Sequence, residues 1–127
     1  MKNVLTNKPV GIIKTMPVKW VKELPFGYER WEKNILAMND YVDHTWVFSL
    51  SNKPKHEVLY FYLLIQGEIR YRANIIGYLG PGEVKCYGGN VMFSKVWVQI
   101  GSPILKLNPP VEMKGFRGFR YTDQIYV

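Results

Sequence analysis

Hydrophobic positions in the first third of the chain follow a strand pattern and then a helical one. Residues 8–16 (KPVGIIKTM) are rich in β-branched side chains and predict a strand that ends at Pro17. Residues 18–24 (VKWVKEL) place apolar side chains three positions apart with lysines between them, which predicts a short helix. Residues 28–40 repeat apolar side chains every three or four positions and predict a second helix.

In the rest of the chain the hydrophobic period is two. Residues 44–51 predict a strand, and residues 58–66 (VLYFYLLIQ) are apolar at nearly every position. Continuous hydrophobicity of this kind indicates a central strand that is covered on both faces. Residues 69–78 alternate, with apolar side chains on one face and Arg70 and Arg72 on the other.

The C-terminal third predicts further extended segments between glycine-rich loops. Loops are expected over residues 79–83 and 87–90, a strand over 91–100, and a proline-marked extended segment over 102–110. The whole pattern predicts a single α+β domain over residues 1–127. We expect a small, mostly antiparallel β-barrel with two or three short helices.

The stretch MKGFRGFRYT (residues 113–122) predicts the last strand. In a regular strand Lys114 and Arg120 lie on one face and Arg117 lies on the other, unless a bulge at a glycine changes the register. We interpret this stretch first as a structural strand, with one arginine contacting a ligand as a secondary role.

Composition indicates a soluble protein with an anionic partner. Seventeen basic against ten acidic residues give a net charge of +7, and the excess is shared by both halves of the chain. Such a balance favours nucleic acid, although an inert basic surface is the alternative. The lone Cys86 leaves no disulfide within the chain, and the longest apolar run is too short to span a bilayer. We expect a cytoplasmic location and no membrane partner.

Few residues offer catalytic or metal-binding chemistry. His44, His56 and the single cysteine lack the number and spacing of a zinc site, so neither metal nor cofactor is expected. The cysteine has no signature of an activated thiol. Asp40 and Asp43 are the nearest pair of carboxylates, and a cap or turn explains them better than catalysis. Residues 80–85 (GPGEVK) begin like a phosphate loop but lack the third glycine of GxGxxG, and no GKS or GKT sequence follows, so we interpret them as a turn.

Aromatic residues are the most distinctive feature, at 15% of the chain. Trp20, Trp31 and Trp46 stand in polar surroundings, the first between Lys19 and Lys22 and the second in the charged stretch ERWEK. An aromatic wall near basic residues can hold a nucleobase, because stacking contributes roughly 1–3 kcal/mol per base and cations hold the phosphates. Ordinary core packing is the alternative for each of these tryptophans.

The order of elements resembles the PUA-like superfamily, which includes the EVE, YTH and ASCH domains. Residues 8–24 resemble the strand-to-helix opening of these families, and residues 57–83 resemble their central hairpin. Residues 96–121 resemble the closing strand, the proline-marked connection and the last strand. The resemblance is one of layout and covers most of the chain.

The resemblance implies binding of DNA or RNA, often with a modified base held in an aromatic cage. Trp20, Trp31 and Trp46 are the cage candidates. EVE- and YTH-like modules also serve as reading domains of McrBC-type, modification-dependent restriction systems. The chain would then belong to a larger parent protein or act with an effector subunit.

Three functional hypotheses follow. The first is a nucleic-acid-binding module that takes a modified, flipped or unpaired base into this pocket while basic side chains neutralise phosphates. The phosphate-binding candidates are Arg70, Arg72, Lys114, Arg117 and Arg120. The alternatives are an ASCH-type nuclease or small amide hydrolase, using His44 or His56 with a carboxylate, and a protein–protein adaptor.

Overall fold

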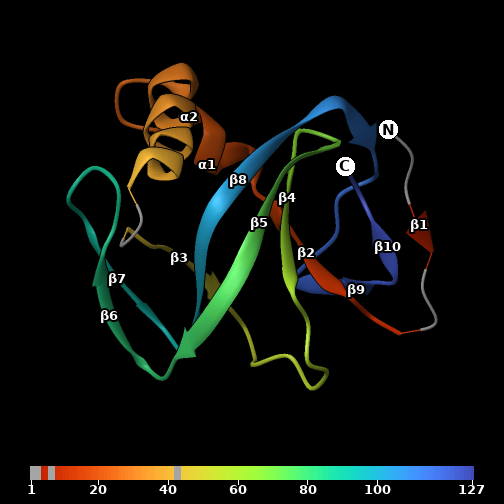
Figure 1. The fold of residues 1–127 in the computed structure, drawn as a ribbon. Helices are drawn as coiled ribbons and strands as arrows, with labels where there is room; N and C mark the ends of the chain where they lie inside the picture. Colours follow the sequence, from red (N-terminus) through yellow and green to blue (C-terminus); the bar gives the residue numbers. More distant parts are fainter. Residues whose placement is uncertain (1–3, 6–7, 42–43) are drawn as a thin grey trace.

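A curled six-stranded sheet dominates the computed structural model, which describes residues 4–5, 8–41 and 44–127 (Figure 1). The strands are β1 (Val4–Leu5), β2 (Gly11–Met16), β3 (Trp46–Leu50), β4 (Tyr60–Ile65), β5 (Glu68–Leu79), β6 (Gly82–Lys85), β7 (Val91–Ser94), β8 (Val96–Glu112), β9 (Phe119–Thr122) and β10 (Gln124–Ile125). The helical segments are α1 (Val18–Lys22), α2 (Tyr28–Leu36) and the 3-10 turn η1 (Ala37–Asp40). This combination of helices and strands confirms the predicted α+β class.

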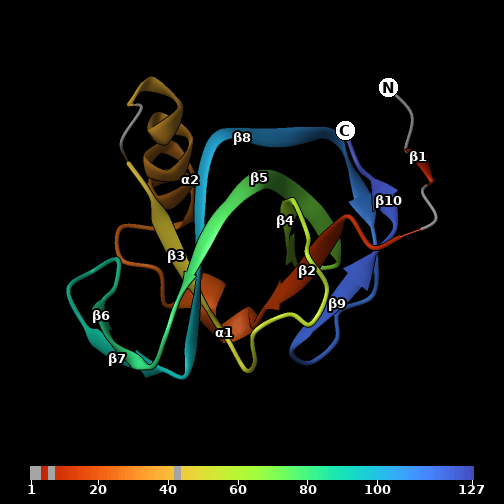
Figure 2. The same ribbon diagram turned by 60° about the horizontal axis from the view of Figure 1, so that its bottom comes forward.

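The main sheet has the strand order β3-β8-β5-β4-β2-β9. Its neighbours pair antiparallel except for β2 and β4, which are parallel. The long strands β5 and β8 bend strongly, so the sheet curls into a half-barrel whose edges are β3 and β9 (Figure 2). Strands β6 and β7 form a separate hairpin beside it, and β1 pairs with β10.

Strand β4 is covered on both faces, as its continuous hydrophobicity predicts. Phe61, Leu63 and Ile65 belong to the larger core on the concave side of the sheet, which also contains side chains of α2. Tyr62 and Leu64 belong to a smaller core on the other side. Two hydrophobic layers therefore fix this strand at the centre of the domain.

The two predicted helices are present, in slightly different lengths. Helix α1 begins after Pro17, whose missing N–H costs nothing in the first turn. Helix α2 continues into η1, so that the predicted segment 28–40 is helical throughout but changes type. Within the described ranges, no helix is long and apolar enough to cross a membrane.

The predicted strand over residues 91–100 is wrong in one respect, because two strands meet there. The Ser94 hydroxyl donates to the Val96 carbonyl at 2.7 Å and accepts from the Val96 N–H at 3.4 Å. These bonds close a tight turn around Lys95, the residue between β7 and β8. Strand β7 turns away to pair with residues 82–85, which are strand β6 and not the turn that their glycines predicted.

The closing stretch is a strand only from Phe119 onward. Gly118 has a φ of +71°, a left-handed conformation that interrupts extended backbone. Upstream of it, the Phe116 N–H donates to Thr15 Oγ1 at 3.2 Å, which fastens the irregular segment to β2. Arg117 therefore lies outside the strand in which it was predicted.

Candidate functional site

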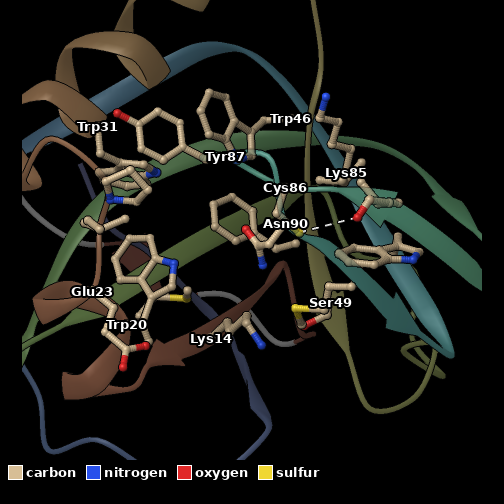
Figure 3. Close-up of a pocket in the computed structure, with 18 of the residues that line it drawn as sticks. Lys14, Trp20, Glu23, Trp31, Trp46, Ser49, Lys85, Cys86, Tyr87 and Asn90 are labelled. Atoms are coloured by element: carbon tan, nitrogen blue, oxygen red, sulfur yellow. Dashed lines mark hydrogen bonds between the residues drawn. The ribbon is translucent and has the colours of Figure 1, made fainter.

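A cavity of about 770 Å³ opens between the concave side of the sheet, helix α1 and the β6–β7 hairpin (Figure 3). All four tryptophans of the chain line it: Trp20, Trp31, Trp46 and Trp97. They come from α1, α2, β3 and β8, which are far apart in the sequence. Folding thus gathers every indole of the protein around one space.

Trp31 is the centre of the aromatic wall. Its ring centroid lies 4.9 Å from that of Trp20, at an interplanar angle of 88°, and 6.5 Å from that of Trp46, at 84°. Both contacts are edge-to-face arrangements that aromatic pairs favour. Trp31 is only 1% exposed, whereas Trp20 and Trp46 are half-buried. Trp31 therefore supports the other two, which border the open space.

Three further aromatic residues that line the cavity, Phe48, Tyr87 and Trp97, were missed by sequence reasoning. Tyr87 lies against Trp46 with ring centroids 6.2 Å apart. Trp97 is buried, and its Nε1–H donates to the Gly82 carbonyl at 3.1 Å, so it also anchors the hairpin. Tyr87 belongs to a predicted loop and Trp97 to an apolar strand, and neither context indicates a pocket.

The β6–β7 hairpin lies in close contact with the side chain of Pro25, which follows helix α1. Gly88 has a φ of +94°, and a Cβ atom there would lie 2.4 Å from Cγ of Pro25.

The single cysteine also lines the cavity, and the Cys86 thiol donates a weak hydrogen bond to the Val84 carbonyl at 3.6 Å. Burial raises the pKa of the Cys86 thiol, which opposes the thiolate form needed for nucleophilic chemistry.

Lys14 is a functional candidate that sequence reasoning did not identify. In strand β2 Lys14 lies two residues from both Ile12 and Met16, so the three side chains share one face. Ile12 and Met16 are buried in the larger core, and the side chain of Lys14 therefore faces the concave side. It borders the cavity together with Trp20 (Figure 3). The available signal was a lysine on the apolar face of a strand in GIIKTM.

The ammonium group of Lys14 is partly removed from water. Burial lowers the pKa of Lys14, and no ion pair offsets this within the part of the chain that the structure describes. Desolvating an unpaired charge costs free energy. A residue kept in that state inside a cavity is a candidate for ligand binding.

Arg70 and Arg72, two of the predicted phosphate-binding residues, are engaged elsewhere. Arg70 forms an ion pair with Glu68 at 3.1 Å, and its guanidinium lies over the Tyr28 ring. Arg72 donates to the Tyr126 carbonyl at 3.2 Å and lies 4.8 Å from the ring centroid of Tyr60. Neither arginine borders the aromatic cavity.

Lys114, Arg117 and Arg120 are exposed and also lie away from the cavity lining. Arg120 pairs in register with Ile13, which belongs to the smaller core. Antiparallel partners share a face, so Arg120 lies on the side of the sheet opposite Lys14. Its guanidinium is 4.4 Å from the ring centroid of Phe116.

The residues considered for catalysis do not converge. His44 and His56 are exposed, and their rings contact Tyr41 and Tyr121 respectively. Neither histidine borders the cavity, and Asp43 lies outside the described residues. Across residues 4–5, 8–41 and 44–127, no three His, Cys, Asp or Glu side chains are grouped as metal ligands.

A polar network supports the cavity from behind Trp31. The Tyr71 hydroxyl bonds both Glu32 and the Tyr28 hydroxyl, and Lys106 pairs with Glu32 at 3.1 Å. Burial raises the pKa of Glu32, but the hydrogen bonds from Tyr71 and Lys106 and the charge of Lys106 outweigh it, so the net pKa is lowered. The rings of Tyr28 and Tyr71 contact Trp31 and hold it in place.

Comparisons with protein-family models, curated proteins and solved structures found no significant match to this chain.

Proposed function

We propose that this chain is a PUA-like, nucleic-acid-binding module that holds one unstacked base in the tryptophan-lined cavity. The observation that carries the proposal is the convergence of Trp20, Trp31, Trp46 and Trp97 on a single open space. Planar bases stack on such rings whatever their sequence, and modified bases add their own contacts.

The cavity matches the proposed ligand in size and chemistry. Small-molecule sites measure roughly 300–1,000 Å³ and combine apolar walls with a few polar groups. The volume of about 770 Å³ lies in that range and leaves room for a base with its sugar and phosphate. Lys14 supplies the cationic group on the concave side.

Phosphates of the neighbouring nucleotides would meet the basic residues around the cavity. Lys85 borders it from the hairpin, and the exposed Lys22 follows Trp20 on α1. In this proposal Lys114, Arg117 and Arg120 serve a longer strand that passes over the opposite side of the sheet. Binding should therefore weaken as salt rises, because each phosphate contact releases counterions.

The base-reading role suits a modification-dependent restriction system of the McrBC type, in which this chain selects DNA or RNA for an effector subunit. Fluorescence titration is a direct test, because every indole of the chain lines the cavity. We would titrate DNA and RNA oligonucleotides, unmodified or carrying N6-methyladenine or 5-methylcytosine, at two salt concentrations. Quenching that depends on the base is the expected result.

Affinity in variants is best followed by anisotropy of a labelled oligonucleotide, since the substitutions remove indoles. Trp46→Ala should weaken binding about tenfold, given that one stacked base contributes roughly 1–3 kcal/mol. Tyr41→Ala, which removes an exposed ring outside the cavity lining, is the matched control and should bind as the wild type does. Failure of every oligonucleotide to bind at low salt would contradict the proposal.

A further inference from the structure

The charge inside the cavity is not balanced by the protein. Glu23 is the one carboxylate among the described residues that line it, and Glu23 pairs with Lys19 at the surface, at 3.8 Å. The second basic residue of the lining, Lys85, lies across the cavity from Lys14 (Figure 3). Lys14 therefore faces the cavity as a cation that lacks an acidic partner in the described chain.

From this geometry we infer that Lys14 binds a phosphomonoester carried by the nucleotide in the cavity. The inference rests on the proposed base-binding function and specifies its ligand class. A phosphomonoester carries more negative charge than a diester and offers three acceptor oxygens to an ammonium group. Lysine binds phosphate as a point charge and needs no particular orientation of the oxygens.

The position of Lys14 favours a terminal phosphate over one within a strand. The residue projects from β2, at the interior of the sheet, between core residues Ile12 and Met16. A diester within a strand is attached to nucleotides on both sides, which keeps it near the cavity mouth. A phosphate at the end of a nucleotide is free to enter with its base. The source is then a free mononucleotide or the phosphorylated end of a strand.

Protonation of Lys14 should be linked to this binding. Burial lowers the pKa of the free amine, and a bound dianion would raise it again. Nucleotide affinity should consequently fall as alkaline pH removes the proton from Lys14. Nucleoside affinity, which lacks the phosphate contact, should not follow the same profile.

The experiment compares a nucleoside with its 5′- and 3′-monophosphates by tryptophan quenching. A charge-assisted contact corresponds to about a tenfold difference in affinity or more. We expect the wild type to bind one of the monophosphates at least that much more tightly than the nucleoside. In Lys14→Met the preference should disappear while nucleoside affinity stays the same. Lys33→Met, at an exposed position of α2 outside the lining, should keep the preference.

Oligonucleotides with and without a 5′- or 3′-terminal phosphate distinguish the two sources. Tighter binding of the phosphorylated end identifies a strand terminus, and a preference confined to mononucleotides identifies a free nucleotide. Equal affinity for nucleoside and nucleotide, or a preference that survives Lys14→Met, would overturn the inference and leave base binding intact. An absence of quenching by all nucleosides, nucleotides and oligonucleotides would overturn both.

Discussion

The Trp20 indole meets the Trp31 indole edge-on, with ring centroids 4.9 Å apart and ring planes at 88°. The two rings nevertheless differ in environment, because Trp31 is 1% exposed and Trp20 is half-buried. One is a core residue that supports the cavity wall, and the other presents surface to the open space. Substituting each should therefore affect different properties.

Trp31→Ala should lower the free energy of unfolding by about 3–5 kcal/mol, the usual cost of removing a large buried aromatic ring. Trp20→Ala should cost clearly less stability while weakening oligonucleotide binding. Urea denaturation followed by far-UV circular dichroism measures both variants without relying on indole fluorescence. Equal losses of stability in the two variants would contradict this division of roles.

The contact between Gly88 and Pro25 should control how the hairpin closes the cavity. Gly88 and Gly89 both have φ near +95°, so an alanine at either position is strained, at about 1–2 kcal/mol. Only at position 88 would the new Cβ also meet Pro25, at 2.4 Å from Cγ, whereas at 89 the nearest atom is 3.9 Å away. Gly88→Ala should thus destabilise the protein more than Gly89→Ala.

Ligand affinity provides a second measure of the same contact. Displacing the hairpin moves Tyr87 and Cys86, which line the cavity, so Gly88→Ala should also weaken binding. Gly89→Ala serves as the matched control for backbone strain alone. If the two variants unfold at the same urea concentration and bind equally well, the hairpin is not held by Pro25.

The ion pair between Glu32 and Lys106 should make the free energy of unfolding depend on pH in the acid range. The net pKa of Glu32 is lowered below the ordinary value of a glutamate, so the folded state favours the charged carboxylate. Its contribution is present above that value and is lost as pH falls through the lowered pKa of the folded state. Glu32→Gln should be less stable near neutral pH, and the difference from the wild type should shrink as the solution becomes more acidic.

Urea midpoints measured at several pH values between neutral and strongly acidic would test this sign. Lys33→Gln, which changes a charge at the neighbouring exposed position on α2, controls for general charge effects. A difference between wild type and Glu32→Gln that does not vary with pH would show that burial cancels the hydrogen bonds and the ion pair.

The sequence was sufficient to predict elements with strong periodicity. Strand β4 was recognisable because it is apolar on both faces, and the alternation in β5 predicted one apolar face and a second face that carries Arg70 and Arg72. The break between β7 and β8 was not predictable, because it depends on bonding of a single serine, Ser94, to the backbone around it.

Part of the candidate site could also be predicted from the sequence. Tryptophans in polar surroundings indicated a pocket, and the structure does bring Trp20, Trp31 and Trp46 together. Their role in base binding stays a prediction. Periodicity within one strand says nothing about which strands curl around a common space, so the hairpin wall and the importance of Lys14 became apparent only from the folded chain.

The buried charge of Lys14 should lower the free energy of unfolding of the wild-type protein. The folded-state pKa of Lys14 is lowered by burial, so the unfolded chain holds the proton more tightly than the folded protein does. Lys14→Met keeps an unbranched side chain only one atom shorter and removes the charge, and it should raise the free energy of unfolding at neutral pH. The gain in stability should narrow as pH rises through the lowered pKa of Lys14 toward the ordinary value of a lysine, because the wild-type amine then loses its charge in the folded state. Chemical denaturation of wild type, Lys14→Met and Lys33→Met at neutral and alkaline pH measures this difference, with Lys33→Met expected to match the wild type. A Lys14→Met protein that is less stable than wild type at neutral pH would mean that the ammonium group is structural, and that its countercharge does not come from a ligand.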